Sequence, residues 1–474
     1  MELLRNINAQ VNTIVWGPYM LLLMLGVGVF YTVKLKGFQV FRFRTWWNVT
    51  FLSLFRHSES KNKVSGISPL QAMSTALAGS VGTGNIVGVA NAITLGGAGA
   101  VFWMWIAALF GMATVFAENV LGVKYRIHRN GHYAGGPMYY IEKGLGCKWL
   151  AVVFAVLCTL ASLGMGNMTQ GNSVAGALDN GFGIPAAVSG AVLSVLVGFI
   201  IFGGIHRIAR LTEKLVPAMT GLFLLGVLVV IGCHITRLPD AFGRILTEAF
   251  DIKCMAGGFM GYGMSRAIKY GISRGVFSNE AGLGTSPIVH AAAETDDPYR
   301  QGMWGVFQVF IDTIVLCTLM ALCILTCDCQ GADLDGIALS TYALSSVLGP
   351  FGHVFMSLSI ILFAFGTLVS WSYYGEQSLS YLTGGKYIVL YRVIYASVTY
   401  IGCVMELSFV WELSDTLNGL MAIPNLIGVL FLSRLVIQIT KNYSARKITK
   451  TQPDLKPMYS AFEEIQREQE ARED

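Results

Sequence analysis

The sequence predicts an all-α polytopic membrane protein with about eleven transmembrane helices. Three observations predict this class: the composition is too apolar for a soluble protein, apolar stretches of spanning length recur, and two of those stretches are interrupted by glycine and polar residues. Of the 474 residues, 54% are hydrophobic and 13% are charged, and the mean hydropathy is +0.58. This composition excludes a soluble globular protein.

The number of spans follows from the length of the apolar stretches. A transmembrane helix needs roughly 20 apolar residues, because the hydrocarbon core is about 30 Å thick and a helix rises about 1.5 Å per residue. The stretches that meet this requirement are 13–33, 70–96, 99–123, 148–176, 185–203, 213–233, 262–290, 302–326, 351–375, 387–405 and 410–437. The first lacks a strongly basic flank and a small-residue cleavage site, so we expect a retained span and not a signal peptide.

Basic residues predict the orientation, because short loops rich in Lys and Arg stay cytoplasmic. The loop after the first span carries Lys34, Lys36, Arg42, Arg44, Arg56, Lys61 and Lys63. With this loop inside, the tail residues Lys441, Arg446, Lys447 and Lys450 are also inside. The acidic loop with Asp328, Asp333 and Asp335 is then outside. We therefore expect a multi-pass protein of the cell (inner) membrane, with its amino terminus outside and its carboxyl terminus cytoplasmic.

Two further expectations concern charge. The seventh span would carry Arg266, Lys269 and Arg274 in its outer half, where they would line an outer vestibule instead of meeting lipid. The net charge of +5 is accounted for by the cytoplasmic loops, so it implies no nucleic-acid partner. We expect a single transmembrane domain over 1–440, followed by a solvated polar tail over 441–474.

Two spans contain interruptions that a lipid-facing helix would not carry. The second span contains Leu77-Ala-Gly-Ser-Val-Gly-Thr-Gly-Asn-Ile-Val-Gly88, and the seventh contains Ser278-Asn-Glu-Ala-Gly-Leu-Gly-Thr-Ser-Pro287. When 13–33 is set aside as an extra amino-terminal helix, these spans are the first members of two groups of five, 70–233 and 262–437. Because five is odd, the second group enters the bilayer from the opposite side, which predicts an inverted repeat with two discontinuous helices.

The interruptions also predict a binding site. Unwinding a helix in hydrocarbon leaves backbone N–H and C=O groups unpaired, which costs several kcal/mol unless a ligand, an ion or a protein group satisfies them. Freed N–H groups favour a carboxylate, and freed carbonyls favour an ammonium group or a hard cation. A zwitterionic amino acid together with a cation fits both. Close helix packing at Gly84 and Gly88 is the alternative, but it leaves the polar residues beside them unexplained.

Five stretches that cover nearly the whole chain carry a resemblance to a known family. They are Gly82-Thr-Gly-Asn-Ile-Val-Gly-Val-Ala90, Ala100-Val-Phe-Trp-Met-Trp105, Gly135-Gly-Pro-Met-Tyr-Tyr140, Arg274-Gly-Val-Phe-Ser-Asn-Glu-Ala-Gly-Leu-Gly284 and Trp371-Ser-Tyr-Tyr-Gly-Glu376. These stretches resemble the alanine or glycine:cation symporter family. The resemblance implies sodium-coupled uptake of small neutral amino acids, chiefly alanine and glycine, through a core built like the bacterial leucine transporter. It implies no enzymatic reaction and no organic cofactor.

The resemblance also implies a substrate site between the second, fourth, seventh and ninth spans. Gly82, Thr83 and Gly84 would present backbone groups to the substrate carboxylate, and the bulky Phe277 and Trp371 would leave room for little side chain. The substrate-binding residues carried over by position are Gly82, Thr83, Gly84, Asn85, Gln170, Phe277, Ser278, Asn279, Thr367 and Trp371.

For sodium, the wider fold suggests a set of oxygen ligands one turn before the first interruption. The carbonyls of Ala78 and Val81 lie just before that interruption, and the ninth span would add the carbonyl of Phe363 and the hydroxyl of Thr367. The family usually has a second hydroxyl residue where this chain has Gly366, so this half of the site departs from the pattern.

Glu280 and His290 carry the alternative to sodium coupling. Glu280 lies near the predicted midplane, where a carboxylate is functional by default. It could bridge the broken helix, act in gating, or couple transport to a cation or a proton. A proton-coupled amino acid transporter using Glu280 or His290 is therefore the rival reading, and a channel or a membrane enzyme would be rivals of other classes.

Overall fold

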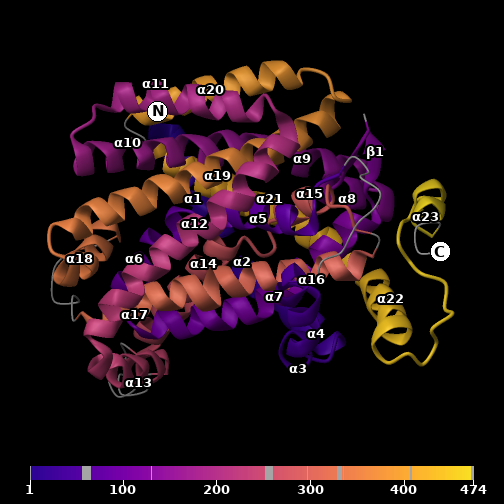
Figure 1. Cartoon of the computed structure of the whole chain (residues 1–474), viewed down its shortest axis with the longest axis horizontal. Coiled ribbons are helices and arrows are strands. Elements are labelled where there is room, and N and C mark those ends of the chain that lie inside the picture. The colour runs from indigo at the N-terminus through magenta and orange to yellow at the C-terminus, as the bar shows by residue number, and fades with distance from the viewer. Residues whose placement is uncertain are drawn as a thin grey trace.

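The computed structural model describes residues 2–55, 66–129, 131–250, 260–295, 297–327, 334, 336–405 and 408–470. Its elements are helices apart from one two-stranded hairpin among these residues (Figure 1). The charged residues Arg56, Lys61, Lys63, Asp328, Asp333 and Asp335, which entered the predicted orientation, lie outside the described ranges.

The first predicted group of five spans is present as helices. Its members are α5 (Pro69–Ser80) with η2 (Thr83–Asn85) and α6 (Val87–Gly96), α7 (Gly99–Lys124), α9 (Lys148–Leu163) continued through η3 (Gly164–Met168) into α10 (Thr169–Phe182), α11 (Ala186–Ile201), and α12 (Gly204–Cys233). Most boundaries lie within a few residues of the prediction. The exceptions are α10, which ends at Phe182 and not near 176, and α12, which begins at Gly204 and not near 213.

The second group follows the same plan. Its members are α14 (Met260–Asn279) with α15 (Ser286–His290), α16 (Pro298–Val309) continued through η6 (Phe310–Cys317) into α17 (Thr318–Thr326), α19 (Phe351–Thr383), α20 (Ile388–Val404), and α21 (Ser408–Phe431). The predicted last span ends early, because the chain bends by 57° between Phe431 and Ser433. The predicted extra helix 13–33 is α2 (Pro18–Lys34), and its first residues belong to α1 (Glu2–Val15).

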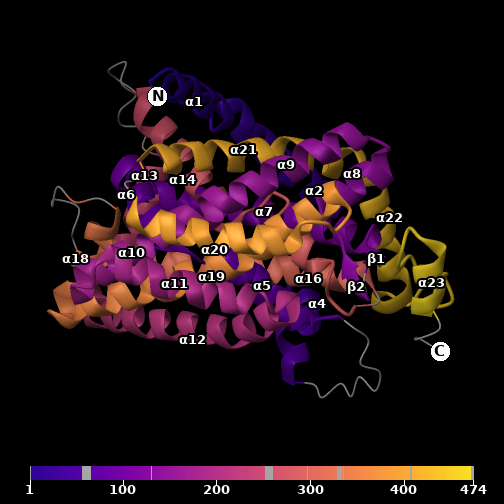
Figure 2. The same ribbon diagram turned by 90° about the horizontal axis from the view of Figure 1, so that it is seen from above.

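Shorter elements join these helices. They are α3 (Phe38–Phe41), α4 (Phe43–Val49), η1 (Phe51–Phe55), β1 (Ile127–Arg129), β2 (His132–Ala134), α8 (Pro137–Leu145), η4 (Ile235–Arg237), α13 (Leu238–Ala249), α18 (Gly336–Leu348), α22 (Ser433–Tyr443), η8 (Ser444–Ile448) and α23 (Glu463–Glu470). Figure 2 shows α13 and α18 at one end of the molecule, here the α18 end, and β1, β2, α22 and α23 at the other, here the hairpin end.

The helices have the length and composition of a multi-pass membrane protein. Six described helices are long and apolar enough to cross a membrane, and two bent pairs meet the same criterion, one of them α5 with η2 and α6. The helices α11 and α20 are apolar but shorter. Their exposed side chains include Val192, Phe199, Val389 and Leu390, so these two helices present an apolar surface to the surroundings.

The first helix break has a local cause at each side. Ser68 caps α5 in a capping box with Gln71, and Pro69 opens the helix. The helix ends at Ser80, because Val81 and Gly82 leave helical geometry, and α6 then continues at 61° to α5. The glycine-rich sequence predicted this break.

The second break depends on left-handed backbone conformations. Gly282 and Gly284 have φ of 89° and 81°, values that glycine adopts without steric cost. Glu280 has φ of 57°, although it carries a side chain. Pro287 then lies in the first turn of α15.

The carboxyl-terminal tail differs from the predicted solvated segment. It folds back on the hairpin end, where the Ala461 N–H donates to the Lys124 carbonyl (2.9 Å) and Lys124 Nζ donates to the Ser460 carbonyl (2.8 Å). Arg446 forms a buried ion pair with Asp297 (2.8 Å). The tail therefore contacts the segment that follows α15.

Candidate functional site

The two helix breaks meet near the middle of the helices. Asn85, at the end of η2, donates through Nδ2 to the hydroxyl of Ser278 in α14 (3.0 Å). Its Oδ1 accepts from the Gly82 N–H (3.2 Å). One amide side chain thus holds the first break in shape and fastens it to the second.

A buried carboxylate lies where the two breaks meet. Asp312, in the π-helical segment η6, accepts from Asn85 Nδ2 (3.0 Å), from Ser278 Oγ (2.7 Å) and from Thr313 Oγ1 (2.9 Å). Asn279 joins this network by donating to Thr313 Oγ1 (3.2 Å). The side chains of Asn85, Ser278 and Asn279, predicted to face substrate, therefore make contacts between helices.

Asp312 lies within the predicted span 302–326 and is not among the predicted site residues. The signal that could have found it was its position, since carboxylates inside the membrane are rare and face the interior of the helix bundle.

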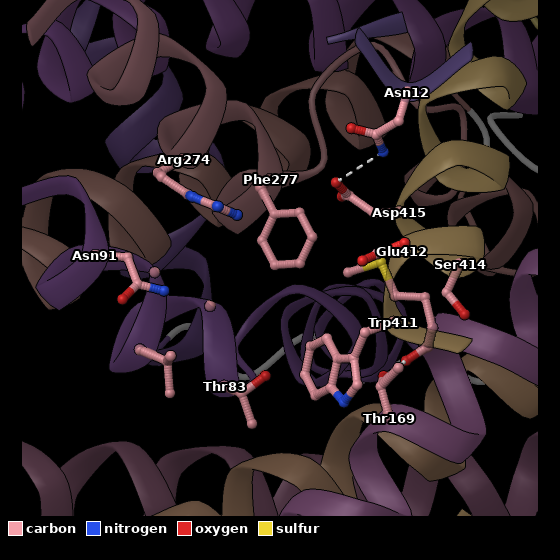
Figure 3. Close-up of a pocket in the computed structure, with 14 residues that line it drawn as sticks. Asn12, Thr83, Asn91, Thr169, Arg274, Phe277, Trp411, Glu412, Ser414 and Asp415 are labelled. Atoms are coloured by element: carbon pink, nitrogen blue, oxygen red, sulfur yellow. Dashed lines mark hydrogen bonds between the residues drawn. The ribbon is translucent and has the colours of Figure 1, made fainter. Parts of the chain in front are cut away.

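A cavity of about 280 Å³ lies beside the first break (Figure 3). Three of the predicted substrate residues line it: Thr83, Gly84 and Phe277. The lining residues that sequence reasoning missed include Asn91, Met165, Thr169, Trp411, Glu412 and Asp415. Figure 3 shows the side chains of Thr83, Phe277 and Trp411 around this space. The cavity is therefore bounded by α1, η2, α6, η3, α10, α14 and α21.

Charged residues line the same cavity. Arg274 of α14 and Asp415 of α21 both line it. Of the three basic residues expected to line an outer vestibule, Arg274 lines this cavity and Arg266 and Lys269 do not. Asn12 of α1 donates to Asp415 Oδ2 (3.4 Å), drawn as a dashed line in Figure 3. Trp16 Nε1 donates to the Asp415 carbonyl (3.1 Å). The extra amino-terminal segment thus positions a residue of the cavity wall.

Gln170 lies next to the first break without lining the cavity. Its Nε2 donates to the Met165 carbonyl (3.3 Å), while its buried Oε1 has no hydrogen-bond partner among the described residues. That oxygen is 3.7 Å from where a Cβ on Gly82 would lie. A buried acceptor without a partner beside an unwound backbone is available to a ligand N–H.

Three of the four predicted sodium ligands come together at the end of α5. The Thr367 hydroxyl lies 3.1 Å from the Ala78 carbonyl oxygen and 3.2 Å from the Phe363 carbonyl oxygen. The fourth, Val81, is the C-cap residue of α5, and its N–H donates to the Leu77 carbonyl (2.7 Å). Two carbonyls and a hydroxyl form a donor set that suits a hard cation.

Trp371 faces the second break. Its Nε1 donates to Glu280 Oε1 (3.1 Å), and Thr285 Oγ1 donates to Glu280 Oε2 (2.6 Å). Glu280 thus bridges α19 and the broken helix. His290 is buried, and its Nδ1 is 2.6 Å from Gln301 Nε2. Neither Glu280 nor His290 lines the cavity of Figure 3.

Two discontinuous helices that meet at a buried polar network, beside a cavity in a multi-pass helical protein, define a secondary transporter. The family model described as the sodium:alanine symporter family matches residues 1–457, and the chain belongs to this family. The family and its named relatives are transporters, so the protein is not an enzyme but a symporter that moves amino acids with a cation.

Individual relatives and solved structures agree with this assignment. The chain is 43% identical over 443 residues to the sodium/alanine symporter AgcS of Methanococcus maripaludis, covering 92% of this chain and 96% of that one. It is 38% identical to the probable sodium/glutamine symporter GlnT of Bacillus subtilis, covering 94% and 92%. The structure of MhsT in complex with L-phenylalanine matches with a TM-score of 0.56 at 13% identity, covering 80% of this chain and 99% of that one. The last comparison shows the fold, that of the bacterial leucine transporter.

Proposed function

We propose that the protein carries small neutral amino acids, alanine and glycine, into the cell together with sodium, by alternating access around the two helix breaks. The observation that supports sodium is the oxygen cluster at the end of α5. The Ala78 carbonyl belongs to the first broken helix, whereas the Phe363 carbonyl and the Thr367 hydroxyl belong to α19. An ion held between two helices favours the arrangement in which both are close, which is how ion binding can be coupled to movement.

In the same proposal, the substrate lies against the first break. The backbone at Gly82 to Gly84 would hold its carboxylate, and Gln170 Oε1, which lies beside Gly82 without a described partner, would accept from its ammonium group. Phe277 limits the side chain that the cavity accepts. The α18 end would face the outside, because the positively charged loops belong to the hairpin end.

Transport by the purified protein tests the coupling ion. Labelled alanine would be supplied to proteoliposomes with a sodium gradient, with lithium or potassium in its place, and with a pH gradient alone. Uptake that needs sodium and returns chemically unchanged alanine is the expected result. Uptake that follows the pH gradient and ignores sodium would overturn the proposal in favour of proton coupling through Glu280 or His290.

A substitution tests the substrate half of the site. Thr83→Leu places a larger apolar side chain in the cavity beside the first break. The matched control is Thr94→Leu, because Thr94 is exposed on α6, the helix that follows η2, and does not line the cavity. Alanine binding to the purified variants should fall on the order of tenfold or more for Thr83→Leu only, since a clash in a packed site cannot be relieved cheaply. Equal binding by both variants would contradict the site.

A further inference from the structure

A second cavity, of about 350 Å³, lies at the hairpin end of the molecule. Its walls come from β1 and β2, the start of α12, the end of α19 and the start of α20, which meet at this end in Figure 2. None of its lining residues lines the cavity beside the first break. The two cavities are therefore separate sites.

Basic side chains line this second cavity. Arg129, His132, His206 and Arg392 line it, and the rings of the two histidines are 5.1 Å apart. Glu376 is the one carboxylate among the described lining residues. It accepts two hydrogen bonds from Arg392, each 2.7 Å long, so those two charges offset each other. Arg129 adds a positive charge that this ion pair does not offset, and imidazole N–H groups are further donors that suit an anion.

Backbone groups at two helix starts also favour an anion in this cavity. The long helix α12 begins at Gly204 and α20 begins at Ile388, and both residues line the cavity. The amino-terminal end of a helix carries partial positive charge and N–H groups without intrahelical acceptors. Two helices therefore direct their positive ends at one space.

A buried hydroxyl in the wall has no partner. Tyr133 lines the cavity and is 3% exposed, and its Oη makes no hydrogen bond to a described residue. The guanidinium carbon of Arg126 lies 3.8 Å from the centroid of the Tyr133 ring, on the ring face. Buried hydroxyls are normally satisfied, so a donor without a partner in a cavity lined by arginine and histidine indicates a missing acceptor.

Three exposed apolar side chains lie near the cavity. Phe202 follows the end of α11, and Val389 and Leu390 lie in the first turn of α20. Their side chains are 47%, 63% and 55% exposed. Acyl chains could lie on these residues while a headgroup enters the cavity.

We propose that this cavity binds a phosphate group of net negative charge, carried either by an anionic phospholipid or by free phosphate. The phosphate oxygens accept from Arg129, from the histidines and from the Tyr133 hydroxyl. Because the cavity joins the β1–β2 hairpin to α19 and α20, a bound phosphate group holds these elements together.

Calorimetric titration of the purified full chain tests this proposal. The ligands are short-chain phosphatidylglycerol, short-chain phosphatidylcholine and inorganic phosphate, and the variants are Arg129→Gln and Gln377→Glu. Gln377 lines the cavity, so Gln377→Glu adds a carboxylate of nearly the same shape. The matched control is Gln452→Glu, because Gln452 is exposed in the tail. Gel filtration establishes that each variant is folded, which matters for Arg129 because it also donates to the Ser380 carbonyl (2.9 Å).

The expected result is binding of phosphatidylglycerol or of inorganic phosphate by the unchanged protein, with little binding of phosphatidylcholine. Arg129→Gln and Gln377→Glu should each weaken binding of the anion on the order of tenfold, and Gln452→Glu should not. Binding of phosphatidylglycerol alone identifies a lipid, and binding of inorganic phosphate identifies a free anion. The proposal is overturned if neither anion binds, or if Gln377→Glu and Gln452→Glu have the same effect.

Discussion

Gly366 lies where a second hydroxyl would complete the proposed sodium site. A Cβ built on Gly366 would be 3.5 Å from Ala78 Cβ and 3.6 Å from the Ala78 carbonyl oxygen, both ordinary contacts. Gly366→Ser therefore fits and adds an oxygen beside the proposed ion. We expect half-saturation of alanine uptake at a lower sodium concentration, by roughly threefold to tenfold, since each hard-cation site is tuned by the number of its oxygen ligands.

The control for Gly366→Ser is Gly221→Ser in α12. A Cβ on Gly221 meets nothing within 4 Å, so this change alters helix propensity without touching the oxygen cluster. Sodium dependence should be unchanged in the control. If the two serine variants have the same sodium dependence as the unchanged protein, the oxygen cluster is not the coupling site.

Asp312 is the acceptor at the centre of the polar network between the two breaks. In Asp312→Asn, an amide group replaces an oxygen that accepts from Ser278 and Thr313. Buried donors then lose their acceptor, which costs roughly 1–3 kcal/mol of stability. Thermal unfolding in detergent should show a lower midpoint, and alanine transport should be lost. Asp179→Asn, at an exposed position of α10, should change neither. A wild-type midpoint for Asp312→Asn would contradict the role given to the network.

Among the helices, the two breaks were predictable and several other elements were not. Glycines beside polar residues in an apolar span predict a break. Glycine allows the backbone to leave the helix, and polar groups satisfy the N–H and C=O groups that unwinding exposes. Hydropathy missed the first turns of α12, where Arg207, Arg210 and Lys214 are charged yet helical. It also missed α18, which is too short to span and which makes one end of the molecule.

The site was predictable only in part for a related reason. Thr83, Gly84 and Phe277 adjoin the breaks, and the structure places them on the cavity. The sequence did not reveal that η6 approaches both breaks. Asn85 and Ser278 were therefore predicted to contact substrate, whereas in the structure their side chains donate hydrogen bonds to Asp312. Trp411 and Asp415 reach the cavity from a distant helix, and single-sequence periodicity carries no information on such contacts.

The Trp371 indole of α19 contacts the second break through its hydrogen bond to Glu280. Trp371→Phe keeps the bulk of the side chain but removes the donor to Glu280 Oε1. A buried carboxylate that loses a donor costs roughly 1–3 kcal/mol, so the unfolding midpoint should fall. Trp149→Phe is the control, because Trp149 is 68% exposed on α9. Equal midpoints for the two variants would mean that the hydrogen bond to Glu280 does not hold the break.

At the scale of the whole molecule, the tail connects the two repeats. Arg446 of η8 pairs with Asp297, which caps α16 directly after the broken helix. The Tyr443 ring stacks on Tyr299 with centroids 4.1 Å apart. Lys124, at the end of α7, holds the tail through Ser460. In the proposed alternating access, a rearrangement of α15 would therefore involve the tail as well as the bundle.

We expect Asp297 to make the stability of the folded chain depend on pH. Burial raises the pKa of Asp297 from 3.8 to about 6, and hydrogen bonding by the Tyr299 N–H and the charge of Arg446 oppose it only in part. Because the folded-state pKa is the higher one, the native chain binds more protons than the unfolded chain between about pH 4 and 6, and stability from this group rises as the pH falls through that window. Because one pKa unit corresponds to about 1.4 kcal/mol, the free energy of unfolding should increase by roughly 3 kcal/mol across this window.

Asp297→Asn, which cannot titrate, tests this dependence on pH. The wild-type unfolding midpoint minus that of the variant should increase between pH 7 and pH 5. The same difference for Asp454→Asn, at an exposed tail residue, should stay constant. If the difference in midpoint instead shrinks on acidification, the charge of Arg446 outweighs burial and the pKa of Asp297 is depressed. The ion pair with Arg446 would then hold the tail, and the prediction would be wrong.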